Sequence, residues 1–171
     1  MPSERRDVAN PSLNKDRLVL DCNVYLQFLL NATGPAGQCV AMGLQDQIEL
    51  FVCPELLQEI HELPEKNVGI ERGITLQIVR RLTEELLDHA ALIQTFPVVY
   101  THPIDPDDSF YVNLAAAAAA KFLVSSDKHL LNLINPAKPW SKEFRYRFAD
   151  IRVLTPAHYL EYAHSTKKQG S

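Results

Sequence analysis

Four acidic residues, far apart in the chain, are candidates for a shared cation site. Asp21 directly follows the apolar run RLVL, and Asp127 follows FLVSS, so each is expected at the end of a buried strand. Glu59 is expected on a helix that follows the run IELFV, and Asp108 at the start of another helix. Because ligands of parallel sheets bind beyond the carboxyl ends of the strands, these carboxylates are expected to meet at one edge.

Carboxylates gathered in this way repel one another and raise one another's pKa unless a cation lies among them. Their oxygen atoms suit Mg²⁺ or Mn²⁺, which keep several waters and bridge to substrate phosphates. The expected chemistry is hydrolysis of a phosphodiester, in which the metal activates the attacking water and stabilises the developing charge. Four carboxylates are compatible with one metal ion or with two.

The elements that position these acids follow from hydrophobic periodicity. Strands are expected at residues 17–21, 48–52, 97–101, 121–127 and 151–154. Helices are expected at 24–31, 38–47, 55–63, 75–93, from the 104–108 turn to about 121, at 128–133 and from 156, with 135–149 irregular. Strands that are unbroken apolar runs and alternate with helices indicate an α/β fold of three layers: a central parallel sheet with helices on both faces.

The two ends of the chain lack this periodicity. Residues 1–16 are predicted to be a flexible leader, 17–165 a single domain and 166–171 a disordered tail. The polar N-terminus has no apolar signal segment, and no apolar run is long enough to span a bilayer, so a cytoplasmic protein without membrane contact is expected. The three cysteines show no paired spacing and are interpreted as reduced thiols.

The net charge of −4 does not by itself suggest a nucleic-acid partner. Setting aside the four candidate acids, however, leaves 17 acidic residues against 17 basic ones, so basic patches could still contact a phosphate backbone. Lys142, Arg145 and Arg147 are interleaved with aromatic residues, a pattern typical of single-stranded RNA binding. The alternative is a loop whose rings pack and whose cations are solvated.

Four stretches together resemble a known family: RLVLDCNVYLQFLL (17–30), VCPELLQEIHEL (52–63), DPDDSFYVNLAAAAAAKFLVSSDKHLLNL (105–133) and VLTPAHYLEYA (153–163). In this order they resemble the PIN domain family, and in particular the VapC-like toxin nucleases of bacterial toxin–antitoxin pairs. The resemblance implies metal-dependent cleavage of single-stranded RNA. It also implies a small antitoxin protein as partner and a homodimer.

Matched position by position, the family's catalytic acids fall on Asp21, Glu59, Asp108 and Asp127. Further matches are Ser125, at the hydroxyl position before the last acid, and Asn23, the amide of the D-x-N motif. Asn23 would hold Asp21 in place or simply cap the following helix. Ser125 and its neighbour Ser126 could orient a metal-bound water or an Asp127 oxygen, or only bond the backbone at a strand end.

Other acids compete for two of these roles. The carboxylates at 105 and 107 lie beside Asp108 near a helix start, where acids are favoured in any case. We expect Asp105 to shape the turn and Asp107 to support the site or face solvent. On the helix of Glu59 the competitors are Glu55, the fallback, and Glu62.

Two other functions are open. A non-catalytic PIN-type module that binds RNA or protein would need no metal, although this chain keeps all four acids. A phosphatase of the D-x-D type also places an acid after the first strand, but this chain has Asn23 where that motif requires the second acid.

Overall fold

The computed structural model describes residues 15–169. Its centre is a five-stranded, all-parallel sheet in the order β3-β2-β1-β4-β5. The strands are β1 (Arg17–Leu20), β2 (Glu49–Val52), β3 (Ala91–Leu92), β4 (Phe122–Val124) and β5 (Arg152–Leu154). The first strand is central because Leu18 pairs with Leu50 on one side and with Phe122 on the other.

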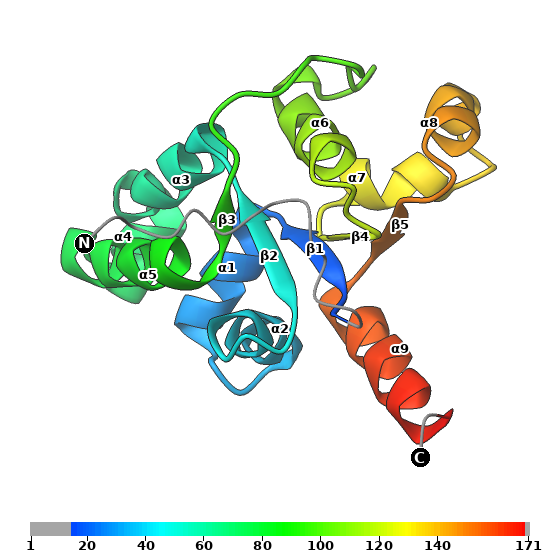
Figure 1. The fold of residues 1–171 in the computed structure, drawn as a ribbon. Helices are drawn as coiled ribbons and strands as arrows, with labels where there is room; N and C mark the ends of the chain where they lie inside the picture. The colour runs from blue at the N-terminus through cyan, green and yellow to red at the C-terminus, as the bar shows by residue number, and fades with distance from the viewer. Residues whose placement is uncertain (1–14, 170–171) are drawn as a thin grey trace, which may run out of the picture.

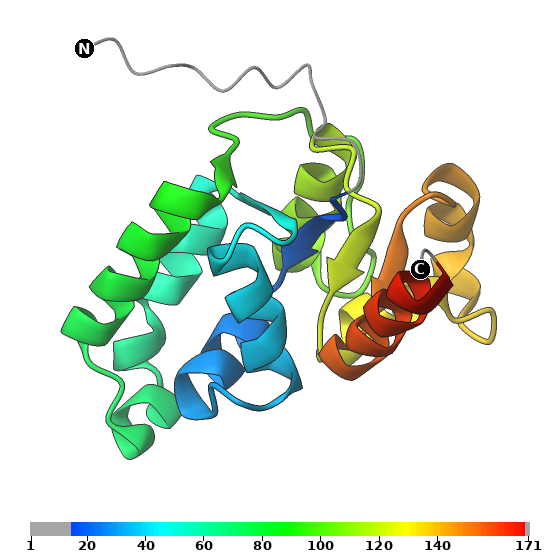
Figure 2. The same ribbon diagram turned by 60° about the horizontal axis from the view of Figure 1, so that its bottom comes forward.

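Helices cover both faces of this sheet, which confirms the predicted three-layer α/β fold (Figure 1). On one side lie α6 (Ser109–Ala117) and α8 (Lys142–Arg147). On the other lie α1 (Cys22–Leu30), α2 (Pro35–Leu44) and α9 (Pro156–Gln169), which come forward in Figure 2.

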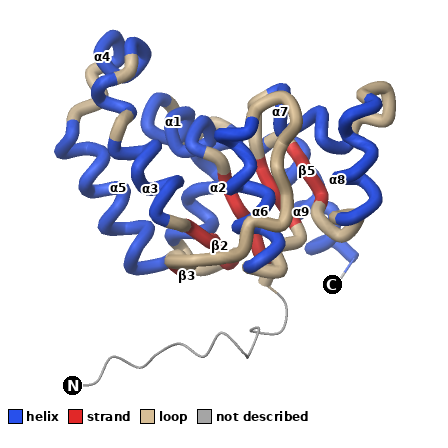
Figure 3. Tube along the Cα trace, turned by 90° about the horizontal axis from the view of Figure 1, so that it is seen from above, coloured by secondary structure: helices blue, strands red, loops and turns tan. Residues whose placement is uncertain are grey.

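The remaining elements extend or connect these layers. Beside α1 and α2, at the β3 edge, pack α3 (Pro54–His61) and α5 (Leu76–His89), whereas α4 (Asn67–Arg72) projects at one corner (Figure 3). The short α7 (Lys128–Leu131) follows β4. Single turns of 3₁₀ helix complete the chain: η1 (Leu63–Glu65), η2 (Pro106–Asp108), η3 (Asn132–Ile134) and η4 (Pro139–Ser141).

The central strands lie where the apolar runs predicted them, because both of their faces are covered. Leu18, Val19 and Leu20 of β1 are fully buried, as are all three residues of β4. Side chains on both faces of such a strand must be apolar, and this produces the unbroken run that identified it.

The strand predicted at 97–101 is wrong. These residues pair with no strand of the described region, and the edge strand β3 lies earlier, at Ala91–Leu92, beside β2. The Asn113 side chain on α6 takes over the backbone bonds: its Oδ1 accepts from Val99 N and Tyr100 N, each at 2.9 Å, and its Nδ2 donates to Tyr100 O at 3.0 Å. A side chain thus satisfies the groups that a neighbouring strand would otherwise pair.

Several boundaries also differ from prediction. The helix predicted at 75–93 ends at His89. The alanine-rich helix α6 ends at Ala117, before the predicted Lys121, because Ala119 adopts a left-handed φ of 48° and turns the chain into β4. Residues 142–147, predicted as irregular, form α8. The last helix continues to Gln169, so residues 166–169 of the predicted tail are helical. The predicted leader lies outside the described residues up to position 14.

Candidate active site

Asp21 connects the central strand to the helix that follows it. Its backbone N–H donates to Val124 O at 3.1 Å, which continues the β1–β4 pairing, and its side chain caps α1 by accepting from Val24 N at 3.0 Å. The helix therefore begins at Cys22 with Asp21 as its cap. The capping role considered for Asn23 is wrong. The Asp21 side chain is also buried, with only 2% of the residue's surface exposed.

Ser125, at the end of β4, links two of the candidate acids. Its hydroxyl donates to Asp21 Oδ2 and accepts from Asp127 N at 2.9 Å. Ser125 is fully buried, whereas Ser126 is exposed. The carboxylate of Asp127 caps α7 through Oδ1, which accepts from His129 N at 2.7 Å and from Leu130 N at 3.4 Å. The ends of the adjacent strands β1 and β4 thus hold both acids in one network of bonds.

Glu59 approaches the same edge from α3 and is held there by Tyr111. The Tyr111 hydroxyl on α6 donates to Glu59 Oε2 at 2.6 Å and accepts from Cys22 N at 2.9 Å. Tyr111 itself is 2% exposed. One phenol group therefore fixes the carboxylate on α3 relative to the first residue of α1.

Asp108 ends the 3₁₀ turn that leads into α6. Its carboxylate makes no hydrogen bond or ion pair with any residue of the described 15–169 region. The turn before it is shaped by buried His102, whose Nδ1 accepts from Ile104 N at 3.1 Å and Asp105 N at 3.0 Å. Its Nε2 lies 3.0 Å from the carbonyl oxygen of His129, which gives the tautomer with the proton on Nε2.

The four candidate acids line one hollow of about 240 Å³ at the carboxyl edge of the sheet. The full set of lining residues is Asp21, Cys22, Asn23, Glu59, Lys66, Asp105, Asp108, Tyr111 and Asp127. Three of the competing acids are placed elsewhere: Glu55 and Asp107 line a separate hollow, and Glu62 lines a neighbouring pocket. Asp105 lines the hollow and also pairs with His129 Nδ1 at 3.2 Å.

Two carboxylates of this hollow have raised pKa values. Burial raises the pKa of Asp21 to about 6, even though its bonds to Ser125 and Val24 act in the opposite direction. Burial also raises the pKa of Asp108 to about 7, and the negative charges of Asp105 and the other candidate acids add to the effect. A cation bound in the hollow would lower both pKa values again, because it balances the negative charge of the ionised carboxylates.

The donor set fits a hard divalent cation. The unpartnered carboxylate of Asp108 and the buried carboxylate of Asp21 are oxygen ligands of the kind Mg²⁺ and Mn²⁺ take. Among residues 15–169, no group of three or more His, Cys, Asp or Glu side chains is arranged to hold a metal ion as it stands. Mg²⁺ needs only one or two carboxylates, with water as its other ligands, so the fit does not require a closed cage.

The basic residues predicted to contact RNA lie on or beside α8, and none of them lines the hollow. Arg145 Nε donates to Ser141 Oγ at 3.0 Å, and Arg147 bonds Val99 O at 2.7 Å and Glu143 at 2.5 Å. Of the aromatic residues, Phe144 is buried, whereas Tyr146 is 87% exposed. Both arginines thus have structural partners, and the predicted RNA contact there stays a prediction.

Sequence reasoning missed three residues of this site: Tyr111, His102 and Lys66. Tyr111 looked like a core position, and it is buried as such, but its hydroxyl bonds Glu59. His102 gives no signal in the sequence, because the histidines do not cluster there. Lys66 gives no signal in the sequence, since it lies in a connection between two helices. In the described region it is the one basic residue that lines the hollow.

The comparisons with known proteins agree with this geometry. Residues 17–129, which are more than half of the chain, match the PIN domain family. These residues contain all four candidate acids. The chain belongs to the PIN domain family, a family with a nuclease-type fold. It is also similar to the uncharacterized protein MJ1680 of Methanocaldococcus jannaschii, with 23% identity over 148 residues, 86% of this chain and 91% of that protein. In the described part of the chain, no helix combines the length and hydropathy needed to cross a membrane.

Proposed function

We propose that this protein is a metal-dependent endoribonuclease that hydrolyses phosphodiester bonds of single-stranded RNA. One observation carries the proposal: the carboxylates of Asp21, Glu59, Asp108 and Asp127, from four separate elements, line a single hollow. The raised pKa values of Asp21 and Asp108 support it, because a carboxylate cluster of this kind is costly without a cation.

Mg²⁺ or Mn²⁺, when bound, supplies a Lewis acid that lowers the pKa of water and offsets the charge developing on the phosphate. The residues of the chain hold the ligands in place. Ser125 orients Asp21, and Tyr111 orients Glu59. Asp108, which has no hydrogen-bond or ion-pair partner among residues 15–169, is the carboxylate most available to a metal ion or to a proton. Hydrolysis adds water across one P–O bond and leaves a phosphate monoester and a free hydroxyl.

Cleavage of a labelled single-stranded RNA tests the activity. With Mg²⁺ or Mn²⁺ we expect internal cleavage that EDTA abolishes, and a loss of about 100-fold or more in Asp21→Asn and Asp127→Asn. Asp107→Asn is the matched control, because Asp107 lines a different hollow. This variant should cleave RNA as fast as the unaltered protein does. Undiminished cleavage by the Asp21 and Asp127 variants would remove the assignment, and a single-stranded DNA of the same sequence tests the preference for RNA.

We further propose that the enzyme is the cytoplasmic toxin of a toxin–antitoxin pair, held inactive by a small antitoxin protein and active as a homodimer. All three cysteines are buried and unpaired, as expected of a reducing compartment. Helix α5, on which Ile78 and Leu87 are each at least 40% exposed, is the candidate dimer element. Co-purification with the product of a neighbouring reading frame, and a molar mass of two chains in solution, are the expected results.

A further inference from the structure

Lys66 occupies a junction between two hollows. It lies between η1 and α4, where its backbone N–H donates to Leu63 O at 3.2 Å. Its side chain is exposed and makes no hydrogen bond or ion pair within the described part of the chain. It lines both the acidic hollow and a neighbouring pocket of about 440 Å³. An unpaired ammonium group here is available to a ligand that spans the two.

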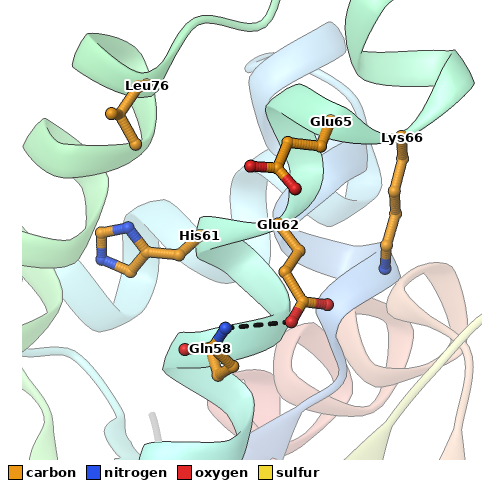
Figure 4. Close-up of a pocket in the computed structure, with 6 residues that line it drawn as sticks. All are labelled: Gln58, His61, Glu62, Glu65, Lys66 and Leu76. Carbon is orange, nitrogen blue, oxygen red and sulfur yellow. Dashed lines mark hydrogen bonds between the residues drawn. The ribbon is translucent and has the colours of Figure 1, made fainter.

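The neighbouring pocket has a different chemistry from the acidic hollow. Its other lining residues are Gln58, His61, Glu62, Glu65 and Leu76 (Figure 4). In that view Lys66 lies on the side opposite His61 and Leu76. Gln58 Nε2 donates to Glu62 Oε1 at 3.0 Å, and Leu76 is 45% exposed.

This composition suits a nucleoside better than a phosphate. Glutamate oxygens accept hydrogen bonds from the exocyclic amino groups of bases and from a ribose 2′-hydroxyl. An exposed leucine and an imidazole ring offer a surface against which a base can pack. A phosphate would instead meet the repulsion of Glu62 and Glu65, so the pocket admits a phosphate only at its Lys66 side.

The negative charge of the acidic hollow also limits where an RNA phosphate can bind. Five carboxylates line it, and among the residues described Lys66 is its one basic side chain. An RNA strand that approaches this rim is repelled everywhere except near Lys66 and any bound metal ion. On α8 the charge of Arg147 is paired with Glu143, and Lys142 and Arg145 do not line the hollow.

We propose that Lys66 binds a backbone phosphate of the RNA, and that the strand leaves the acidic hollow past Lys66 with its next nucleoside in the pocket beside His61. The inference rests on the proposed ribonuclease function for its substrate. It assigns the path of that substrate along α3 and η1, away from α8.

Binding of a fluorescent single-stranded oligoribonucleotide in EDTA tests the contact without cleavage. Lys66→Met should weaken binding and lower the slope of log affinity against log salt by about 0.7, the value for one lost phosphate contact on a single strand. Lys66→Arg should keep the slope. Lys168→Met removes the same charge at the far end of α9 and should behave like the unaltered protein. An unchanged slope in Lys66→Met, or no RNA binding by the unaltered protein, overturns the proposal.

Photo-crosslinking with a 4-thiouridine oligomer tests the path. Cross-links are expected in the peptide that contains residues 58–76, and cross-links confined to residues 142–147 would overturn it. Cleavage assays separate this proposal from the preceding one. If the protein cleaves RNA with a metal but Lys66→Met leaves RNA binding unchanged, only the Lys66 proposal is contradicted. If the protein binds RNA through Lys66 without cleaving it, only the ribonuclease proposal is contradicted.

Discussion

Tyr111 donates a hydrogen bond to Glu59 at 2.6 Å across 52 residues of sequence. The same hydroxyl accepts a bond from Cys22 N, the first residue of α1, at 2.9 Å. One buried phenol therefore joins α6, α3 and α1 at the rim of the acidic hollow. Because Asp21 immediately precedes Cys22, the position of Glu59 relative to Asp21 depends on this hydroxyl.

Replacing Tyr111 by phenylalanine tests this dependence. Tyr111→Phe keeps the ring but releases Glu59 and leaves the Cys22 N–H unpaired, a cost of about 1–3 kcal/mol in unfolding free energy. We expect a loss of about 10- to 100-fold in metal affinity or in cleavage at limiting metal. Metal titrations followed by cleavage rate measure it. Tyr25→Phe is the matched control, since the buried Tyr25 hydroxyl has no hydrogen-bond partner in the described part of the chain. Equal effects in the two variants would contradict the role of Tyr111.

Ser125 is expected to act on Asp21 in a comparable way. The Ser125→Ala variant removes a donor that lowers the pKa of Asp21, so that this pKa should rise further above about 6. The pH at which cleavage reaches half its maximum should shift upward, and pH–rate profiles at fixed metal measure it. The exposed neighbour provides the control, Ser126→Ala, which removes only a 3.4 Å contact with Gln27. A profile of Ser125→Ala that coincides with the unaltered protein would argue against the link.

The sequence predicts the central strands well because their burial leaves a local signature. Both faces of β1 and β4 are covered, so their residues form unbroken apolar runs. The two-residue β3 at the sheet edge has no such run, since Ala91 and Leu92 are both exposed. The false strand at 97–101 has the right residue types, but a side chain from α6, distant in sequence, decides its bonding.

The residues of the site also differ in whether the sequence near them indicates their role. Asp21, Asp108 and Asp127 were predictable because each stands beside an element boundary that the sequence marks, and Glu59 lies on a helix that the sequence also predicts. Tyr111 and Lys66 were not, because the hollow that they line is formed by segments far away in the chain. The bond from Cys22 to Tyr111 spans 89 residues, and nothing near Tyr111 in sequence distinguishes it from a residue that only packs.

His102 is predicted to hold the turn that carries Asp108. Its buried imidazole accepts from Ile104 N and Asp105 N, so His102→Leu leaves both N–H groups unpaired and should cost about 2–4 kcal/mol in unfolding free energy. Cleavage should fall as well, because the turn positions Asp108. Denaturant unfolding and cleavage assays measure the two effects. His158→Leu, at an exposed position of α9, should change neither. Full activity and full stability in His102→Leu would contradict this role.

The raised pKa values of Asp21 and Asp108 predict how stability varies with pH in the metal-free protein. An aspartate of the unfolded chain has a pKa near 3.8, whereas in the folded protein these two have pKa values of about 6 and about 7. The folded state therefore holds these protons more tightly. Between pH values of about 4 and 7 the unfolded chain loses them first, so the contribution of both groups to stability falls as pH rises. A divalent cation binds the ionised folded form and should restore stability most at the upper end of this window.

Thermal unfolding at about pH 5 and about pH 8, in EDTA and in excess Mn²⁺, measures both effects. Without metal at about pH 8, Asp108→Asn should stabilise the protein by about 1 kcal/mol, because it removes a repelled charge from a partly screened site. That corresponds to an increase in Tm of about 2–4 °C. The same variant should lose most of the Mn²⁺-induced increase in Tm, whereas Asp107→Asn should retain it. A lower Tm for metal-free Asp108→Asn would show that Asp108 stabilises the fold, and its place among the metal-binding carboxylates would then have to be abandoned.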